Sequence, residues 1–267
     1  MDPRPLLTLT TDFGDKDPFA GIMKGVILSI NPSVQIIDIT HNIGPQNVLE
    51  AAFTLEMGYN SFPHKTVHVV VVDPDVGSDR RPLLVVTDYH YYIGPDNGIF
   101  SRIYSMTETL AVYHVTAEHY FSSQRSSTFH GRDVFAPAAA WFSKGVDAAK
   151  FGDLISDYVT LQLPVPAITT ENSAAGEILY VDRFGNLMTN ISIQNIKDLM
   201  NSTGKKGLRV EMKGMDAPLK KFYSSGEEKK LFCLINSFGY LELFVNKGNA
   251  SGTFSVTVGE KVSVTCG

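Results

Sequence analysis

Cysteine is scarce in this chain of 267 residues, in which only Cys233 and Cys266 are present. Two cysteines cannot build a disulfide framework, and this pair lacks the spacing of zinc ligands. Cys233 stands in the apolar run LFCLI, so we expect it to be a buried core thiol. These features favour a reducing, cytoplasmic setting.

Charge and long apolar runs are also limited. Charged residues make up 19% of the chain, and 23 Lys and Arg against 28 Asp and Glu give a net charge of −5. This acidic balance argues against a general phosphate-binding surface, so we expect no nucleic-acid partner. The apolar run VHVVVV at Val67–Val72 is far too short to span a bilayer. The N-terminal MDPRPLLTLT lacks the basic segment and apolar core of a signal peptide, so we also expect no membrane partner.

Several common catalytic motifs are absent. No GxGxxG opens the first predicted helix, and neither GxxxxGK[ST] nor GxSxG occurs, which argues against dinucleotide, nucleoside triphosphate and serine hydrolase sites. A metal site built from Asp12, Asp73, Asp75 and His130 is conceivable, but no local spacing such as HExxH supports it. We therefore expect no metal and no cofactor.

The first part of the chain alternates strand and helix patterns, and its length allows one or two domains. Strand patterns occur at Leu6–Thr11, Val34–Thr40, Val67–Val72, Leu83–Thr87 and Leu110–Val115, and helical spacing at Phe19–Ile30, Val48–Met57 and Val134–Ser143. This alternation predicts an α/β domain with a largely parallel sheet over residues 1–162.

A different pattern follows the proline-containing segment Leu163–Thr169, which we interpret as a linker. Short strand patterns separated by glycine- and asparagine-containing turns occur at Glu177–Val181, Leu208–Met212, Leu231–Asn236, Tyr240–Val245 and Lys261–Thr265. Short strands with few helices predict a small β-barrel or sandwich over residues 170–267.

Polar residues gather where the apolar strands end. Asp12 follows the first strand, Asp73 follows the buried run, and Asp96 and Asn97 lie in GPDNG. In open α/β sheets, ligands bind outside the carboxyl ends of the strands, so these side chains suggest one pocket. The alternative is that they only form turns.

Two further stretches carry candidate chemistry. Asp73 at the mouth of a buried strand needs a cation or several donors to stay ionised, and Arg80 is a suitable partner unless this is a solvated loop with balanced charges. In TFHGRDVFAP, His130 is a candidate proton handler or water orienter, although a structural role is the common one for a histidine. Gly131 beside it would let a ligand approach the backbone closely.

Six ordered motifs give the chain a specific resemblance. LTTDFG, VVDPxVGxxRR, GPDNG, TFHGRDVFAP, VDRFGN, and NSFGYLE followed by VNKGNAS span most of the sequence. With these motifs the chain resembles the S-adenosyl-L-methionine (SAM) hydrolases, also called SAM hydroxide adenosyltransferases, which are relatives of the SAM-dependent fluorinase and chlorinase. The resemblance implies a Rossmann-like N-terminal α/β/α domain, a smaller C-terminal β-barrel, and a homotrimer with the SAM site between neighbouring subunits.

The resemblance also implies a reaction, the attack of water or hydroxide on C5′ of SAM to give adenosine and L-methionine. The sulfonium is a good leaving group, so the chemistry needs an in-line nucleophile and a dry, preorganised pocket. The catalytic set of the family falls on Asp73, Arg80 and His130. In this interpretation Arg80 holds Asp73 ionised, and His130 with Asp73 holds the water, as base or only as positioner.

Substrate-binding roles are carried over by the same resemblance. Asp12 matches the ribose-binding aspartate, Asp182 the residue that binds the methionine ammonium, and Ser237 a serine near the methionine carboxylate. Phe184 and Asn186 match the residues flanking the adenine. The remaining substrate-binding candidates are Asp17 and Asn97.

Two features bear on alternatives to hydrolysis. Val76 and the His130–Gly131 pair stand where the fluorinase has hydroxyl side chains, and an anionic Asp73 would repel a halide, so hydroxide is favoured over halide. Asp75 stands where the family usually has glycine, which could strain the backbone or raise the pKa of a carboxylate. A protein that binds SAM or adenosine without turnover is therefore the alternative, and a halogenase is a weaker one.

Overall fold

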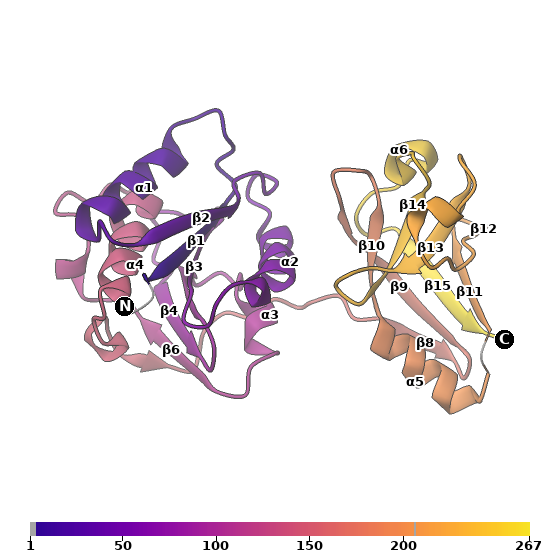
Figure 1. Ribbon diagram of the computed structural model, residues 1–267. Coiled ribbons are helices and arrows are strands. Elements are labelled where there is room, and N and C mark those ends of the chain that lie inside the picture. Colours follow the sequence, from indigo (N-terminus) through magenta and orange to yellow (C-terminus); the bar gives the residue numbers. More distant parts are fainter. Residues whose placement is uncertain (1–3, 206) are drawn as a thin grey trace. The chain divides into compact units, whose positions relative to one another are not determined.

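The computed structural model describes residues 4–205 and 207–267 (Figure 1). The chain divides into two compact units, of which the first ends at Leu161 and the second begins at Gln162. Among the described residues, no helix combines the length and the apolar character that a bilayer crossing requires.

The first unit is built on a seven-stranded mixed sheet. Its strands are β1 (Leu6–Thr11), β2 (Gln35–Thr40), β3 (Val67–Val71), β4 (Pro82–Thr87), β5 (Tyr91–Pro95), β6 (Leu110–His114) and β7 (Leu154–Ile155), in the order β2-β1-β3-β5-β4-β6-β7. β2, β1, β3 and β5 pair in parallel, whereas β4, β6 and β7 join antiparallel.

The expectation of a largely parallel sheet is therefore only half right. β4 and β5 are joined by a three-residue turn, closed by the Thr87 N–H donating to the His90 carbonyl at 3.1 Å. A connection this short can only reverse the chain, because a parallel pair needs a crossover of a dozen or more residues. A mixed α/β architecture is confirmed, and a Rossmann-like sheet is not.

Helices cover both faces of this sheet (Figure 1). On one face, α1 (Phe19–Ile30) and α4 (Ala136–Ser143) share a core with Val69 and Val71 of β3. On the other face, α2 (Val48–Gly58) and the short α3 (Ser101–Tyr104) pack with Val70. Successive side chains of a strand point to opposite faces, and both faces are covered, which explains why β3 is buried throughout and apolar apart from His68.

The second unit is a nearly closed antiparallel sheet. Its strands are β8 (Ala167–Thr170), β9 (Ser173–Val181), β10 (Leu187–Ser192), β11 (Leu208–Met212), β12 (Met215–Asp216), β13 (Leu231–Ile235), β14 (Tyr240–Val245) and β15 (Lys261–Cys266), with helices α5 (Ile193–Thr203) and α6 (Ala250–Phe254). The strand order is β12-β11-β15-β9-β10-β14-β13, and β8 pairs with β9. A bridge between Leu219 and Cys233 brings the segment after β12 onto the last strand of that order. The segment Leu163–Thr169, which we interpreted as a linker, ends within β8.

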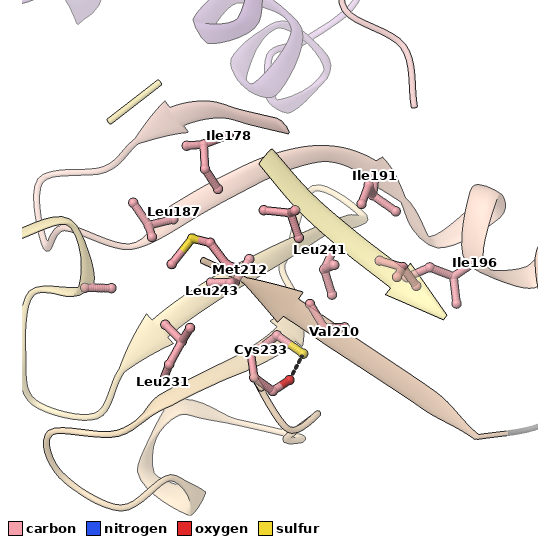
Figure 2. Packing of buried hydrophobic residues seen from close by; sticks show 14 of the residues in the cluster. Ile178, Leu187, Ile191, Ile196, Val210, Met212, Leu231, Cys233, Leu241 and Leu243 are labelled. Atoms are coloured by element: carbon pink, nitrogen blue, oxygen red, sulfur yellow. Dashed lines mark hydrogen bonds between the residues drawn. The ribbon is translucent and has the colours of Figure 1, made fainter. Parts of the chain in front are cut away.

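Figure 2 shows the core of this unit, where apolar side chains from several strands meet. Cys233 is fully buried there, as predicted, and its thiol donates to the Ala217 carbonyl at 3.0 Å. Desolvation raises the pKa of this thiol to about 12. Such a thiol stays protonated, so it packs as a small apolar group and is not a nucleophile.

Candidate active site

A carboxylate, a guanidinium and an imidazole meet beyond the end of β3. Arg80 donates from Nε to Asp73 Oδ1 at 2.9 Å and from Nη2 to Asp73 Oδ2. The same Nη2 lies 2.7 Å from His130 Nδ1. The side chains of Arg80 and Asp73 are only 7% and 5% exposed. The structure thus brings together the three residues that the sequence predicts to be catalytic.

The surroundings hold this cluster in place. Arg80 lies over the ring of Phe135, with 5.1 Å between its Cζ and the ring centroid. His130 immediately precedes a π-helical turn, Gly131–Phe135, which leads directly into α4. Such turns are rare and occur often at functional sites. The turn at the start of α4 therefore places His130 beside Arg80, which lies 50 residues earlier in the chain.

The contact with Arg80 determines which nitrogen of His130 carries the proton. A guanidinium only donates hydrogen bonds, so His130 Nδ1 must accept. Burial, together with the charge of Arg80, lowers the pKa of His130 from its ordinary value. At neutral pH His130 is therefore a neutral imidazole whose hydrogen is on Nε2, that is, a hydrogen-bond donor.

A cavity of about 330 Å³ opens beside this cluster in the first unit, and we call it the front cavity. Its lining residues come from four segments of the chain and are Asp12, Phe13, Phe19, Gln46, Val71, Asp73, Pro74, Val76, Thr128, Phe129, His130 and Gly131. Asp12 accepts from the Gln46 N–H at 2.8 Å. A carboxylate for a polar ligand and the Asp73–His130 pair therefore face one space.

A second cavity, of about 500 Å³, lies in the second unit. It is lined by Asp182, Phe184 and Asn186 together with Tyr223, Val245, Lys247 and Gly248. Asp182 accepts from the backbone N–H groups of Phe184 and Asn186, at 2.9 and 2.8 Å, and from the Asn186 side-chain amide at 2.9 Å. The turn is thus closed by its own aspartate, and it presents a Phe184 ring that is 76% exposed.

Three predicted substrate-binding residues do not line either cavity. Asp17 is exposed in the loop before α1, and Ser237 is exposed in the turn between β13 and β14. Asn97 donates to the Val72 carbonyl at 2.9 Å and accepts from the Ile99 N–H at 3.2 Å. Its amide is therefore used to hold the backbone next to Asp73, which is the turn-forming interpretation of GPDNG.

Asp75 does not carry the strain that the sequence comparison suggested. It is exposed, does not line the front cavity, and does not have a positive φ. The strained position is Gly77, with φ +84°, where a Cβ atom would lie 2.2 Å from the Ser127 carbonyl oxygen. The glycine requirement of this loop is therefore at residue 77.

Several residues of the front cavity were not predicted from the sequence. Gln46 adopts φ +63°, which is uncommon for a residue with a side chain, and its backbone holds Asp12. Phe13, Phe19 and Phe129 form a cluster of edge-to-face rings with centroids 5.3 to 5.9 Å apart. The two motifs LTTDFG and TFHG contain Phe13 and Phe129, so the aromatic wall could have been noticed, whereas the role of Gln46 is a backbone contact without a sequence signal.

No group of three or more His, Cys, Asp or Glu side chains is placed to hold a metal ion within residues 4–205 and 207–267. The two carboxylates of the front cavity have different partners, because Asp73 pairs with Arg80 and Asp12 accepts from the Gln46 backbone N–H.

Comparison with known families gives two matches that together cover most of the chain. The sequence model of the SAM hydroxide adenosyltransferase N-terminal domain matches residues 7–152, and that of the C-terminal domain matches residues 176–263. The two matched stretches fall in the first and second units, respectively.

Individual relatives agree with these matches. The chain is 34% identical to an (R)-S-adenosyl-L-methionine hydrolase from Methanocaldococcus jannaschii, over 97% of this chain and 95% of that one. It is 32% identical to an enzyme of the same name from Salinispora tropica, with both chains fully covered. A fluorinase from Nocardia brasiliensis is 26% identical over 99% of this chain and 98% of its own.

A solved structure shows the same fold. The crystal structure of a conserved protein from Thermotoga maritima superposes with a TM-score of 0.89 at 33% identity, and the alignment covers 97% of this chain and 99% of the other. Together with the matches to both domains and the full-length relatives, this places the chain in the SAM hydroxide adenosyltransferase family.

Proposed function

We propose that this protein is an enzyme that hydrolyses S-adenosyl-L-methionine at C5′, releasing adenosine, L-methionine and a proton. The observation that carries the proposal is the Asp73–Arg80–His130 cluster, of which Asp73 and His130 line the front cavity. The names of full-length relatives at 32% and 34% identity support it. Because those names specify the R form of SAM, we extend the proposal to a preference for the (R) epimer.

In this proposal Asp73 receives the proton of the attacking water. Arg80 uses one acceptor position on each carboxylate oxygen, and each oxygen keeps another lone pair for the water. The water oxygen forms a bond to C5′ while the C5′–S bond breaks. The electron pair of the C5′–S bond goes to the sulfur and neutralises the sulfonium. No acid is needed for this leaving group, so one base and one positioning group are sufficient.

His130 is the positioning group rather than the base. Its Nδ1 already accepts from Arg80, so Nε2–H can only donate, for example to a lone pair of the water. The base role is left to Asp73, which lines the same cavity. We therefore propose the positioning role for His130, between the two roles that the sequence left open.

Water is favoured over halide for reasons of charge and of donor chemistry. The front cavity presents the Asp73 carboxylate together with Val76 and Gly131, which offer no hydroxyl donor, and Thr128 supplies the one hydroxyl side chain in its described lining. A carboxylate attracts the hydrogens of water and repels an anion. We therefore propose that halide ions do not replace water as the nucleophile.

Substrate binding is proposed to use both units. Asp12 is assigned to the ribose hydroxyls, while Asp182 is assigned to the methionine ammonium and Phe184 with Asn186 to the adenine. These groups line two separate cavities, one in each unit. We propose a homotrimer in which a site combines the first unit of one subunit with the second unit of its neighbour. The cytoplasmic location expected from the sequence stays a prediction.

The test is to incubate the purified protein with (R)-SAM and with (S)-SAM, with and without chloride, and to separate the products by chromatography. Equal amounts of adenosine and methionine, faster from the (R) epimer and unchanged by chloride, are expected. The control is Asp73→Asn, which keeps the size of the side chain and removes the base. Adenosine release equal to that control would contradict hydrolysis.

Other products would identify the alternatives. Intact SAM that stays bound through a long incubation would indicate a binding protein without turnover, and chloride-dependent loss of SAM would indicate a halogenase. The Asp75→Gly variant belongs in the same experiment because Asp75 was the sequence feature that favoured binding alone.

A further inference from the structure

A row of polar contacts connects the edge strand β2 with the loop that carries Asp12. Lys24 donates to Asp38 Oδ2 at one end. Asp38 Oδ1 lies 3.1 Å from His41 Nε2, at ion-pair distance but without hydrogen-bond geometry, and His41 Nδ1 lies 2.9 Å from Thr11 Oγ1. Thr11 Oγ1 in turn accepts from the Phe13 N–H at 3.3 Å. None of these contacts touches the Asp73–Arg80–His130 cluster.

The charges around Asp38 determine one end of this row. Burial raises the pKa of Asp38, but the hydrogen bond from Lys24 and the charge of His41 outweigh it and hold the pKa below its ordinary value. A carboxylate only accepts, so the attraction between Asp38 and His41 requires a hydrogen on Nε2. At the other end, the Thr11 hydroxyl and His41 Nδ1 share one hydrogen bond, and the Thr11 oxygen accepts from the Phe13 N–H.

The backbone around His41 is tied to the same loop. The His41 carbonyl accepts from the Gly14 N–H at 2.6 Å, and the Thr11 carbonyl accepts from the Ile43 N–H at 3.3 Å. Gln46, in the same connection after β2, donates its N–H to Asp12. Asp12 and Phe13 therefore sit in a loop that is held on several sides by the segment following β2, with His41 at its start.

We propose that His41, oriented by Asp38 and acting through Thr11, is a positioning residue that places Asp12 and Phe13 for the ribose of the substrate. This inference rests on the proposed function, because it takes the assignment of Asp12 to the ribose hydroxyls. His41 and Thr11 are almost fully buried, with 5% and no exposure, so neither touches substrate itself. Preorganised ligand-binding groups need such supporting contacts to stay in the productive position.

The chain offers a matched control for a test. Thr8 is also on β1, is also fully buried, and its hydroxyl lies 2.8 Å from the Nδ1 of another histidine, His68. Thr8→Val therefore removes the same kind of hydrogen bond from the same strand without touching the Asp12 loop. Thr11→Val removes the connection under test, and Thr11→Ser keeps the hydroxyl.

The experiment measures the equilibrium binding of adenosine and of 2′,3′-dideoxyadenosine, which lacks the 2′ and 3′ hydroxyls of the ribose, to the full chain and its variants. Thr11→Val is expected to raise the Kd for adenosine about tenfold and to lose the preference for adenosine over the dideoxy nucleoside. Thr11→Ser and Thr8→Val are expected to stay within about twofold of the wild type.

Each other outcome has a meaning. Equal effects of Thr11→Val and Thr8→Val, or equal weakening of both nucleosides, would show a merely structural role and overturn the inference. If Thr11→Val does not fold, Asp38→Ala interrupts the same contacts near the surface and is expected to raise the adenosine Kd two- to threefold, with no change again overturning it.

Binding needs no turnover, so this test separates the two claims. A wild type that binds adenosine through its hydroxyls but does not hydrolyse SAM contradicts the proposed function alone. A wild type that hydrolyses SAM but binds both nucleosides equally contradicts the role of Asp12, and with it the positioning role of His41.

Discussion

At the scale of single residues, Arg80 makes three different contacts with one planar group. It pairs with both oxygens of Asp73, donates to His130 Nδ1 and lies over the Phe135 ring. Lysine carries its charge on a compact ammonium that cannot form a two-pronged pair and stack on a ring at the same time. The cluster therefore depends on the shape of arginine and not only on its charge.

Replacing Arg80 by lysine is expected to lower kcat about 100-fold or more, because Asp73 and His130 lose their mutual orientation. Arg102 provides the control, since it pairs with both oxygens of Glu56 and lies 5.0 Å from the centroid of the Phe53 ring. Both substitutions should lower the free energy of unfolding by about 1 to 2 kcal/mol, because each removes a two-pronged pair. Arg102→Lys should nevertheless leave kcat nearly unchanged. Steady-state kinetics and urea unfolding check this, and equal losses of kcat in both variants would contradict it.

Substitutions of Asp75 and Gly77, which lie in one loop, are expected to have very different effects. Asp75→Gly is expected to leave kcat within about twofold, because Asp75 is exposed and unstrained. Gly77→Ala is expected to cost roughly 1 to 3 kcal/mol and most of the activity, since its Cβ would collide with the Ser127 carbonyl. Melting temperatures and kcat of the two variants test this. A large gain in activity for Asp75→Gly would show that this aspartate restrains the enzyme.

At the scale of elements, the contact between β3 and the β4–β5 turn buries two histidines. His68 on β3 and His90 in the turn have ring centroids 5.1 Å apart and exposures of 0% and 1%. Both ring nitrogens of His90, and Nε2 of His68, have no hydrogen-bond partner among the described residues. Burial lowers the pKa of His68 to about 3 and that of His90 to about 4.

These histidines predict that the first unit loses stability in acid. The unfolded chain takes up protons near pH 6.5, whereas the folded chain does not until pH falls to the lowered pKa values. The loss therefore begins below about pH 6.5 and amounts to roughly 2 kcal/mol per histidine at pH 5. His90→Phe should flatten this dependence between pH 7 and 5, as measured by urea unfolding. An unchanged slope would show that His90 does not cause it.

The elements that the sequence predicted correctly are those whose local pattern agrees with their burial. β3 is an apolar run interrupted only by His68, and α1 has apolar residues at helical spacing ended by Pro32. β10 was missed because LMTNIS mixes apolar and polar residues although five of its six side chains are buried. The helix α5 was missed although Ser192 and Asn195 form a capping box at its start, because its interior is largely polar.

The candidate site was predictable to the extent that strand ends and motifs mark it. The family prediction is confirmed by matches to both domains, and the three catalytic candidates lie in contact. Asn97 was predicted to bind substrate, but its side-chain amide forms hydrogen bonds with the backbone of its own loop. Short polar side chains in loops often bond nearby backbone groups in this way. The chemical roles of Asp73, Arg80 and His130 stay predictions.

At the scale of the whole molecule, the candidate groups are divided between the two units. Asp12 and Asp73 line a cavity of the first, and Asp182 lines a cavity of the second. Two inactivating substitutions can therefore be placed one in each unit. Asp73→Asn removes the base, and Asp182→Asn removes the charge proposed for the methionine ammonium while keeping an acceptor for the turn.

Co-expression of these two variants under different affinity tags, followed by purification through both tags, tests the proposed trimer. If each site combines units from neighbouring subunits, every trimer that carries both tags has one of its three sites free of both substitutions, so about a third of the wild-type activity should return. If each site is formed within one chain, every site carries one of the two substitutions and no activity returns. The separately purified variants, mixed only in the assay, control for contamination. The stoichiometry from light scattering decides whether the recovering species contains three chains, and a monomer with full wild-type activity would contradict the shared site directly.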